Sequence, residues 1–349
     1  MRVDGVDALL PRRTTAQPGY VAGVLVDGGP VLRTAAGATD VRTARPLTPD
    51  AICYVGSLAK QFVAACVALL WRDGVLDPDD PVSRFVPGLP AWGERVTLAH
   101  LTHHTGGLPP PAYGPSGLPP SGMPPYSSAD QLARTAAVDR LPGEPGARYV
   151  YSWMGYVLLA QAVAAAAGEP LASLAARRIF EPLGMTDSFF RDRPDPLPER
   201  AARGHFLADD GELHVEPAAF HAVGSGGLWT TLDDLARWDA NLTEDRLTDG
   251  WLPRQLLTRG RLSDGTEVHY AWGVSVRTHR GLAIVSHGGS FPGWASKMVR
   301  FPEHGVTVIV LANEEELDAS ALTFRIADHV LADEIDGSAP HADDTRSGA

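Results

Sequence analysis

The stretch Cys53-Tyr-Val-Gly-Ser-Leu-Ala-Lys-Gln-Phe62 leads from an extended segment into a helix predicted over residues 57–71. The apolar positions of this helix recur at helical spacing, at Leu58, Phe62, Ala65 and Leu69. Asp73-Gly74 supplies the stop signal. Because the helix is mostly apolar, we expect it to be central and buried.

Ser57 and Lys60 lie three residues apart at the start of this helix, which places a hydroxyl and an amine on one face. All but two of the 30 basic residues are Arg, and the exceptions are Lys60 and Lys297. A guanidinium keeps its proton in proteins, whereas a buried ammonium can lose it and accept the proton of a serine. The alternative is a Ser that caps the helix, followed by a surface Lys. The position of the pair in an otherwise uncharged, buried helix favours catalysis.

Outward from the helix, strands are predicted near both ends of the chain. An opening hairpin covers residues 20–36, and four further strands are expected at 270–276, 282–285, 294–301 and 306–312, followed by a helix over 319–330. We therefore predict an α+β fold, in which residues 1–75 and 266–335 form a sheet domain closed by both chain ends. Residues 76–265 form an inserted α-rich region, and residues 336–349 a tail. The proline-rich segment Pro109–Pro125 is expected to be extended or turn-like, and we interpret it as either a flap over the site or a plain surface loop.

Composition limits the partners and the location. A net charge of −12 and a pI near 5.4 disfavour nucleic acid and anionic lipid. No stretch is apolar enough to span a bilayer, and the first residues contain acids and a proline where a secretory signal needs an apolar run, so we expect a cytoplasmic protein. Cys53 and Cys66 are expected to be reduced, structural thiols.

Four weaker motifs each have a structural alternative. His287-Gly288-Gly289, leading into Ser290, offers a strand edge that a substrate backbone can approach, or merely a turn with an incidental histidine. Tyr151-Ser152 opens a helix, where it is either catalytic or a cap beside a core tyrosine. The adjacent His103 and His104 lack the spacing of a metal pair and are expected to be structural. Gly224-Ser-Gly-Gly227 is expected to make a tight turn near the site.

Taken together and in order, seven segments resemble the class C β-lactamase-like family, which also includes penicillin-binding proteins, esterases and D-amino-acid peptidases. The resemblance covers roughly residues 18–330. The segments are Cys53–Phe62, Leu76–Val82, Leu101–Leu108, Pro145–Ser152, Ile179–Met185, Gly226–Ala236 and His287–Gly293.

The resemblance implies an antiparallel sheet flanked by helices, with the site in a cleft beside the α-rich region. It makes Ser57 the acylated serine, Lys60 its partner and Tyr151 the residue that passes the proton to the leaving group. The backbone N–H groups of Ser57 and Ser290 match the oxyanion hole. His287, Gly288, Gly289 and Ser290 are then substrate-binding residues, and His287 stands at a position that is Lys in β-lactamases and often His in the esterases and peptidases.

One position departs from the family pattern. The second motif is usually Tyr-x-Asn, whereas this chain has Tyr151-Ser152-Trp153. The Asn amide contacts the acyl side chain of the substrate, and an indole has no acceptor with which to replace it. We therefore predict a serine hydrolase, foremost an esterase acting on small ester or amide substrates, with Trp153 lining the acyl pocket and with no metal or other cofactor. The alternatives are an acyltransferase, a β-lactamase or D-amino-acid peptidase, and a non-hydrolytic penicillin-binding or sensor protein.

Overall fold

The computed structural model describes residues 1–110, 127–208, 211–215 and 221–335, together with residues 337, 339 and 341. Of the proline-rich segment, only residues 109–110 fall within this part of the chain. The interpretation of that segment as a flap or surface loop therefore lies outside the described residues. Most of the expected tail lies outside them as well.

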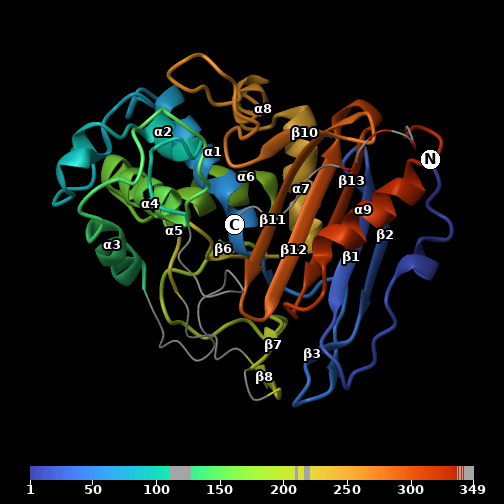
Figure 1. The fold of residues 1–349 in the computed structure, drawn as a ribbon. Helices are drawn as coiled ribbons and strands as arrows, with labels where there is room; N and C mark the ends of the chain where they lie inside the picture. The colour runs from blue at the N-terminus through green and yellow to red at the C-terminus, as the bar shows by residue number, and fades with distance from the viewer. Residues whose placement is uncertain are drawn as a thin grey trace.

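A six-stranded antiparallel sheet is built from both ends of the chain, in the order β10-β11-β12-β13-β1-β2 (Figure 1). Strand β1 pairs with β13 from Tyr20↔Ala312 to Val26↔Val306, which joins the two ends. This pairing confirms the predicted α+β fold with an antiparallel sheet. The strands are β1 (Tyr20–Val26), β2 (Gly29–Ala36), β10 (Ser275–His279), β11 (Leu282–Phe291), β12 (Trp294–Phe301) and β13 (Val306–Ala312). The domain division at residues 75 and 265 stays a prediction.

Strand β10 begins five residues later than the predicted start at residue 270. The cause is Gly273, which has a φ of +77° and approaches the first turn of helix α1 (Lys60–Arg72) closely. A Cβ at this glycine would lie 2.5 Å from the Cα of Gln61. Tyr270 to Gly273 therefore leave the strand geometry to pack against α1, and the ladder starts only beyond them.

Two hydrophobic layers sandwich the sheet. Helix α9 (Ala319–Val330), predicted at these same residues, covers one face and packs Leu322 and Ile326 against Val299 and Val308. The other face contacts the helical region around α1 (Figure 1). Every residue of the sheet strand β13 is buried, because both faces are covered.

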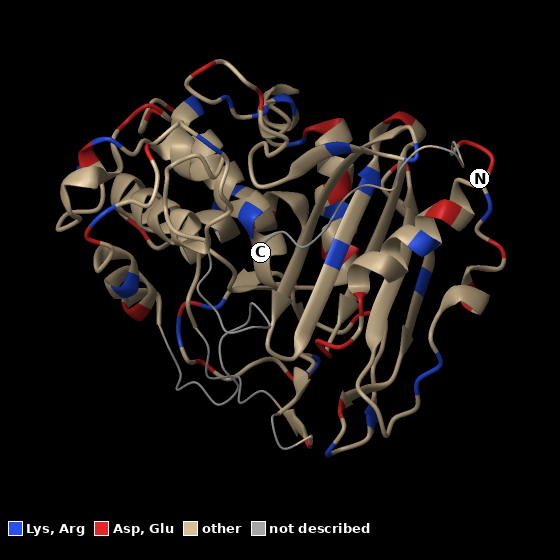
Figure 2. Ribbon diagram, viewed as in Figure 1, with Lys and Arg blue, Asp and Glu red and all other residues tan. Residues whose placement is uncertain are grey.

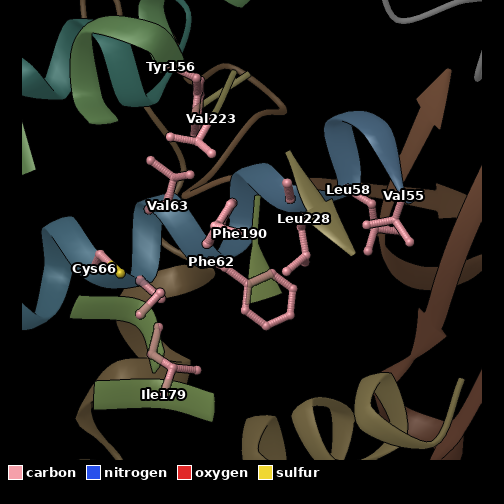
Figure 3. Packing of buried hydrophobic residues seen from close by; sticks show 14 of the residues in the cluster. Val55, Leu58, Phe62, Val63, Cys66, Tyr156, Ile179, Phe190, Val223 and Leu228 are labelled. Atoms are coloured by element: carbon pink, nitrogen blue, oxygen red, sulfur yellow. The ribbon is translucent and has the colours of Figure 1, made fainter. Parts of the chain in front are cut away.

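Helix α1 runs through the centre of the helical region, as predicted. All its residues from Lys60 to Leu70 are buried. Figure 3 shows Phe62, Val63 and Cys66 pointing outward from the helix into the surrounding core. The Phe62 ring lies 4.6 Å from that of Trp238 and 5.7 Å from that of Phe180. A helix buried on all sides has no solvent face, so Lys60 cannot be a surface lysine.

The remaining helices surround α1 or cover the sheet edges. Helix α4 begins at Trp153, directly after Tyr151-Ser152, where the sequence predicts that a helix opens. The other α-helices are α2 (Leu98–Thr102), α3 (Ser128–Ala136), α4 (Trp153–Ala167), α5 (Leu171–Ala175), α6 (Glu181–Leu183), α7 (Leu232–Glu244) and α8 (Trp251–Leu256). The other strands of at least three residues are β3 (Ala38–Asp40), β7 (His205–Leu207), β8 (Leu213–Val215) and β9 (Leu228–Thr230). Two-residue strands are β4 (Arg45–Pro46), β5 (Cys53–Tyr54) and β6 (Phe189–Phe190).

Charged residues of both signs are interspersed over the described chain, while α1 and α4 are largely uncharged (Figure 2). Within the described residues, no single helix combines the length and the apolar composition needed to cross a membrane. One pair, Trp153–Ala167 with Leu171–Leu183, meets both criteria only when taken together across a 76° bend.

Candidate active site

Ser57 lies in a tight 3-10 turn, Gly56–Ala59, directly before α1. The sequence predicts that the helix itself begins at Ser57; the structure instead starts the α-helix at Lys60. Gly56 has a φ of +53°, a left-handed conformation that glycine adopts without strain. This turn holds Ser57 at the sheet, because a Cβ at Gly56 would lie 3.0 Å from the backbone nitrogen of Ser290 on β11.

Lys60 is completely buried next to the serine. Its Nζ lies 2.8 Å from Ser57 Oγ and donates to the backbone carbonyl of Ser225 at 2.7 Å. Burial lowers the pKa of Lys60 to about 7. A neutral amine keeps N–H groups for the Ser225 carbonyl and has a lone pair free to accept the Ser57 proton. The arrangement therefore suits a base at near-neutral pH.

Tyr151 brings a hydroxyl to the same serine from the segment before α4. Desolvation raises the pKa of this phenol, and its hydrogen bond with Ser57 partly opposes the rise. Lys60 Nζ lies 5.2 Å from the centre of the Tyr151 ring. Tyr151, which is distant in sequence from Ser57 and Lys60, thus meets them at one point.

The 3-10 turn Gly56–Ala59 and the end of β11 approach each other closely. A Cβ at Gly289 would lie 2.9 Å from the backbone nitrogen of Ser57 and 2.0 Å from the carbonyl oxygen of Val55. Ser296 Oγ donates to that same carbonyl at 2.8 Å, which ties β12 to the turn. The backbone nitrogens of Ser57 and Ser290 therefore lie on adjoining segments. Their assignment to an oxyanion hole stays a prediction.

His287 is buried on β11, and its ring lies 6.4 Å from that of Tyr151. Nδ1 lies 2.6 Å from the carbonyl oxygen of Gly288, and Nε2 lies 2.8 Å from the hydroxyl of Tyr270. A carbonyl only accepts, so Nδ1 carries the proton and Nε2 accepts from Tyr270. Burial, followed by repulsion from Lys60, lowers the pKa of His287 to about 3, so the imidazole is neutral.

The other predicted site residues, Ser290, Gly288 and Trp153, lie in different surroundings. Ser290 is exposed at the end of β11. Gly288 faces the opposite side of the sheet from Gly289, since a Cβ there would meet Lys297 on the face that α9 covers. Trp153 is buried at the first turn of α4, two residues after Tyr151. Its expected role in the acyl pocket stays a prediction.

Sequence reasoning missed two neighbours of the site. Tyr270 was assigned to a strand, and His104 was considered structural. The structure places the His104 ring 4.3 Å from that of Tyr151 and 4.5 Å from that of Tyr270. Their only signal in the sequence is the aromatic, titratable character of the side chains, because the contacts join segments that are far apart in the chain.

Other titratable groups lie apart from the residues around Ser57. The thiols of Cys53 and Cys66 are free and buried, and burial raises the pKa of each to about 12. His279, Asp328 and His341 place three possible metal-ligand atoms within 4.8 Å of one another, beside β10 and α9. Arg280 already donates to Asp328 there at 2.9 Å, so a cation balances the carboxylate.

Comparison with known proteins agrees with this geometry. Penicillin-binding protein 4* of Bacillus subtilis (strain 168) is 29% identical over 328 residues, which cover 87% of this chain and 70% of that protein. The D-aminopeptidase of Gluconobacter oxydans (strain 621H) is 27% identical over 318 residues, which cover 89% of this chain but 58% of the relative. The chain thus spans less than two thirds of the length of that D-aminopeptidase.

Solved structures show the same fold. The octameric penicillin-binding protein homologue from Pyrococcus abyssi has a TM-score of 0.80 and 26% identity, with 91% of this chain and 74% of that chain covered. The D-amino acid amidase from Ochrobactrum anthropi SV3, complexed with L-phenylalanine amide, has a TM-score of 0.75 at 22% identity and covers 94% of this chain and 98% of that one. A sequence model described as Beta-lactamase matches residues 6–331. The chain therefore belongs to the β-lactamase family, and it is a serine hydrolase of the group that includes penicillin-binding proteins and D-aminopeptidases.

Proposed function

We propose that the protein hydrolyses small, uncharged esters through an acyl-enzyme on Ser57. The observation that carries the proposal is the neutral His287, whose Nε2 is occupied by the Tyr270 hydroxyl at 2.8 Å. At this position the resemblance gives β-lactamases a lysine, which is a cation when it is protonated. An uncharged imidazole offers no counter-ion for a carboxylate, so a substrate without a charge on this side fits the cleft better.

In the first half-reaction, Ser57 Oγ attacks the carbonyl carbon and its proton passes to Lys60 Nζ, 2.8 Å away. The backbone N–H groups of Ser57 and Ser290 hold the oxyanion of the tetrahedral intermediate. Tyr151 then gives its hydroxyl proton to the leaving alcohol and recovers a proton from Lys60. In the second half-reaction a water molecule gives up a proton to the same pair, attacks the acyl group and restores Ser57. The pair acts as one unit, because Lys60 and Tyr151 are coupled through Ser57.

Trp153 supports the choice of ester over amide. It replaces the Asn of the family motif, so this position contributes an apolar surface and one N–H donor but no acceptor. An acyl group without an amide loses nothing in such a pocket, whereas an acylamino group would lose a hydrogen-bond partner.

A second candidate, an amidase that releases uncharged amines, is favoured by the relatives. One of them is a D-aminopeptidase and another chain of the same fold is a D-amino acid amidase. Both ester and amide cleavage use the same acyl-enzyme, and an amine or alcohol that intercepts it would make the protein an acyltransferase.

Product analysis separates these possibilities. The purified chain is incubated with p-nitrophenyl acetate, with D-phenylalanine amide and with benzylpenicillin, each with and without hydroxylamine as an acceptor. We expect ester turnover to exceed amide turnover, with acetate as the main product and slow acylation by penicillin. Preferred cleavage of the amide establishes the second candidate, and acetohydroxamate as the main product establishes acyl transfer. Rapid penicillin acylation contradicts the proposal.

A further inference from the structure

His104 holds the segment around Tyr151 from both sides. The N–H of Val150, the residue before Tyr151, donates to the His104 carbonyl at 2.9 Å. The N–H of Ser152, the residue after it, donates to Nδ1 of the His104 ring at 3.3 Å. The backbone N–H groups of the two residues next to Tyr151 therefore both donate to His104.

The His104 ring also packs against the phenol itself. The two ring centres lie 4.3 Å apart with an interplanar angle of 43°. Tyr270 lies 4.5 Å and Tyr156 5.2 Å from the His104 ring on its other sides. Because His104 is only 3% exposed, its ring has little freedom, and the Tyr151 ring has little room to rotate.

His104 carries features that cost stability. Its φ is +56°, a left-handed conformation that is uncommon for residues other than glycine. Since Nδ1 accepts from Ser152, the ring proton sits on Nε2, which has no hydrogen-bond partner among the described residues. Burial, then repulsion from Lys60, lowers the pKa of His104, which keeps Nδ1 available as an acceptor. Strained backbone and an unsatisfied buried N–H persist where surrounding structure requires them, and they cluster at functional sites.

We propose that His104 is a positioning residue, which fixes the hydroxyl of Tyr151 at Ser57 by accepting hydrogen bonds from the backbone N–H groups of both neighbouring residues and by packing against the phenol ring. The inference rests on the proposed function of Tyr151 as the proton carrier. His104 itself touches no reacting atom, so its effect is on the chemical step and not on substrate affinity.

The neighbouring His103 provides a matched control. It is buried as well, and its Nδ1 lies 3.3 Å from the backbone carbonyl of Tyr270. Among the described residues, its ring contacts that of Trp272 and not that of Tyr151. The test compares His104→Gly, which accommodates the positive φ but removes the ring, with His104→Asn, which tolerates this φ and keeps an acceptor. His103→Gly measures the cost of losing a buried histidine in the same turn.

Two readouts are measured on each variant: steady-state kinetics with p-nitrophenyl acetate and the rate of Ser57 labelling by a fluorophosphonate, each alongside the melting temperature. We expect His104→Gly to lower kcat roughly 10²-fold at a KM within threefold of wild type, because small misplacements of a catalytic group cost about that much. We expect His104→Asn to recover most of this loss, and His103→Gly to melt earlier at a kcat near that of wild type.

Equal kcat losses in His104→Gly and His103→Gly, or a His104→Gly variant that turns over like wild type, overturn the positioning role. If His104→Gly fails to fold, the comparison of His104→Asn with His104→Gln decides, since only Asn matches both the backbone conformation and the acceptor position. A wild-type chain that neither cleaves esters nor reacts with the fluorophosphonate refutes the proposed function itself, and with it the role given to His104.

Discussion

Nζ of Lys60 lies 2.8 Å from Oγ of Ser57, and the lysine side chain is completely buried. The second partner of Nζ is a neutral backbone carbonyl, that of Ser225, at 2.7 Å. Burial lowers the pKa of Lys60 to about 7. The site thus combines a nucleophile with a base that is ready to accept its proton, and the following predictions test this relationship and its surroundings.

Lys60→Arg should abolish ester hydrolysis nearly as completely as Ser57→Ala. The guanidinium keeps the positive charge but cannot release its proton, so it cannot accept one from Ser57. We expect a loss on the order of 10³-fold or more for both variants, as for removal of a nucleophile or its base. Initial rates with p-nitrophenyl acetate check this, with circular dichroism as the folding control. If Lys60→Arg keeps a tenth of the activity, Lys60 is not the proton acceptor.

The pH dependence of kcat/KM should follow Lys60. Below a pH of about 7 the amine is protonated and cannot act as a base, so kcat/KM should fall about tenfold per pH unit there. Above this pH the amine is neutral, and kcat/KM should level off, because the raised pKa of Tyr151 keeps the phenol protonated. His287, with a pKa lowered to about 3, should add no step between pH 5 and 9. A profile that falls as pH rises through 7 contradicts this assignment.

Gly289→Ala should prevent acylation of Ser57, whereas Gly288→Ala should have a much smaller effect. A Cβ at Gly289 would lie 2.0 Å from the Val55 carbonyl and 2.9 Å from the Ser57 nitrogen, so it would displace one N–H of the oxyanion hole. At Gly288 the nearest atoms lie at 3.2 and 3.4 Å, on the other side of the strand. Loss of one oxyanion donor costs about 10²–10³-fold in kcat. The measurement is the burst of p-nitrophenol on mixing, and equal bursts in the two variants would place the oxyanion hole elsewhere.

His287→Lys should move the preference of the protein towards substrates that carry a carboxylate. A lysine adds the cation that the neutral imidazole lacks, and its charge also repels the ammonium form of Lys60. We expect faster acylation by benzylpenicillin, seen as an increase in the mass of the intact chain, together with a kcat/KM profile whose midpoint moves to lower pH. His287→Gln, which is neutral, serves as the control. Equal penicillin reactivity in the Lys and Gln variants would show that charge at this position does not set specificity.

Trp153→Asn should raise the rate of reaction with amide-bearing acyl groups relative to simple esters. The new side chain both donates and accepts, as the family motif does, and we expect a change in the rate ratio of about tenfold or more, the size of one or two hydrogen bonds. The rates to compare are ester turnover and penicillin acylation in wild type and variant. Rapid acylation of the wild type by penicillin, with an unchanged ratio in the variant, would return the β-lactamase interpretation to first place.

The sequence predicted several local elements well. The apolar spacing of Leu58, Phe62, Ala65 and Leu69 indicated a buried helix, and the structure shows one. Turn residues and β-rich runs located β12, β13 and the start of β11, because these signals lie within a few residues of one another in the chain. Strand β11 continues to Phe291, beyond the predicted end at residue 285. The scarcity of lysine singled out Lys60 before its surroundings were known.

Only the tertiary structure determines the contacts between segments that are far apart in the chain. Strand β10 begins later than predicted because Gly273 packs against α1. No local sequence pattern indicates this contact. His104 and His103 are equivalent in sequence, yet only the positive φ at His104, next to the incoming Tyr151 segment, turns its ring onto the phenol. The protonation of His287 likewise depends on a hydroxyl 17 residues away and on burial. Residue types and their spacing follow from local energetics, whereas a pKa, a tautomer and an oxyanion hole arise from desolvation and contacts that exist only once the chain has folded.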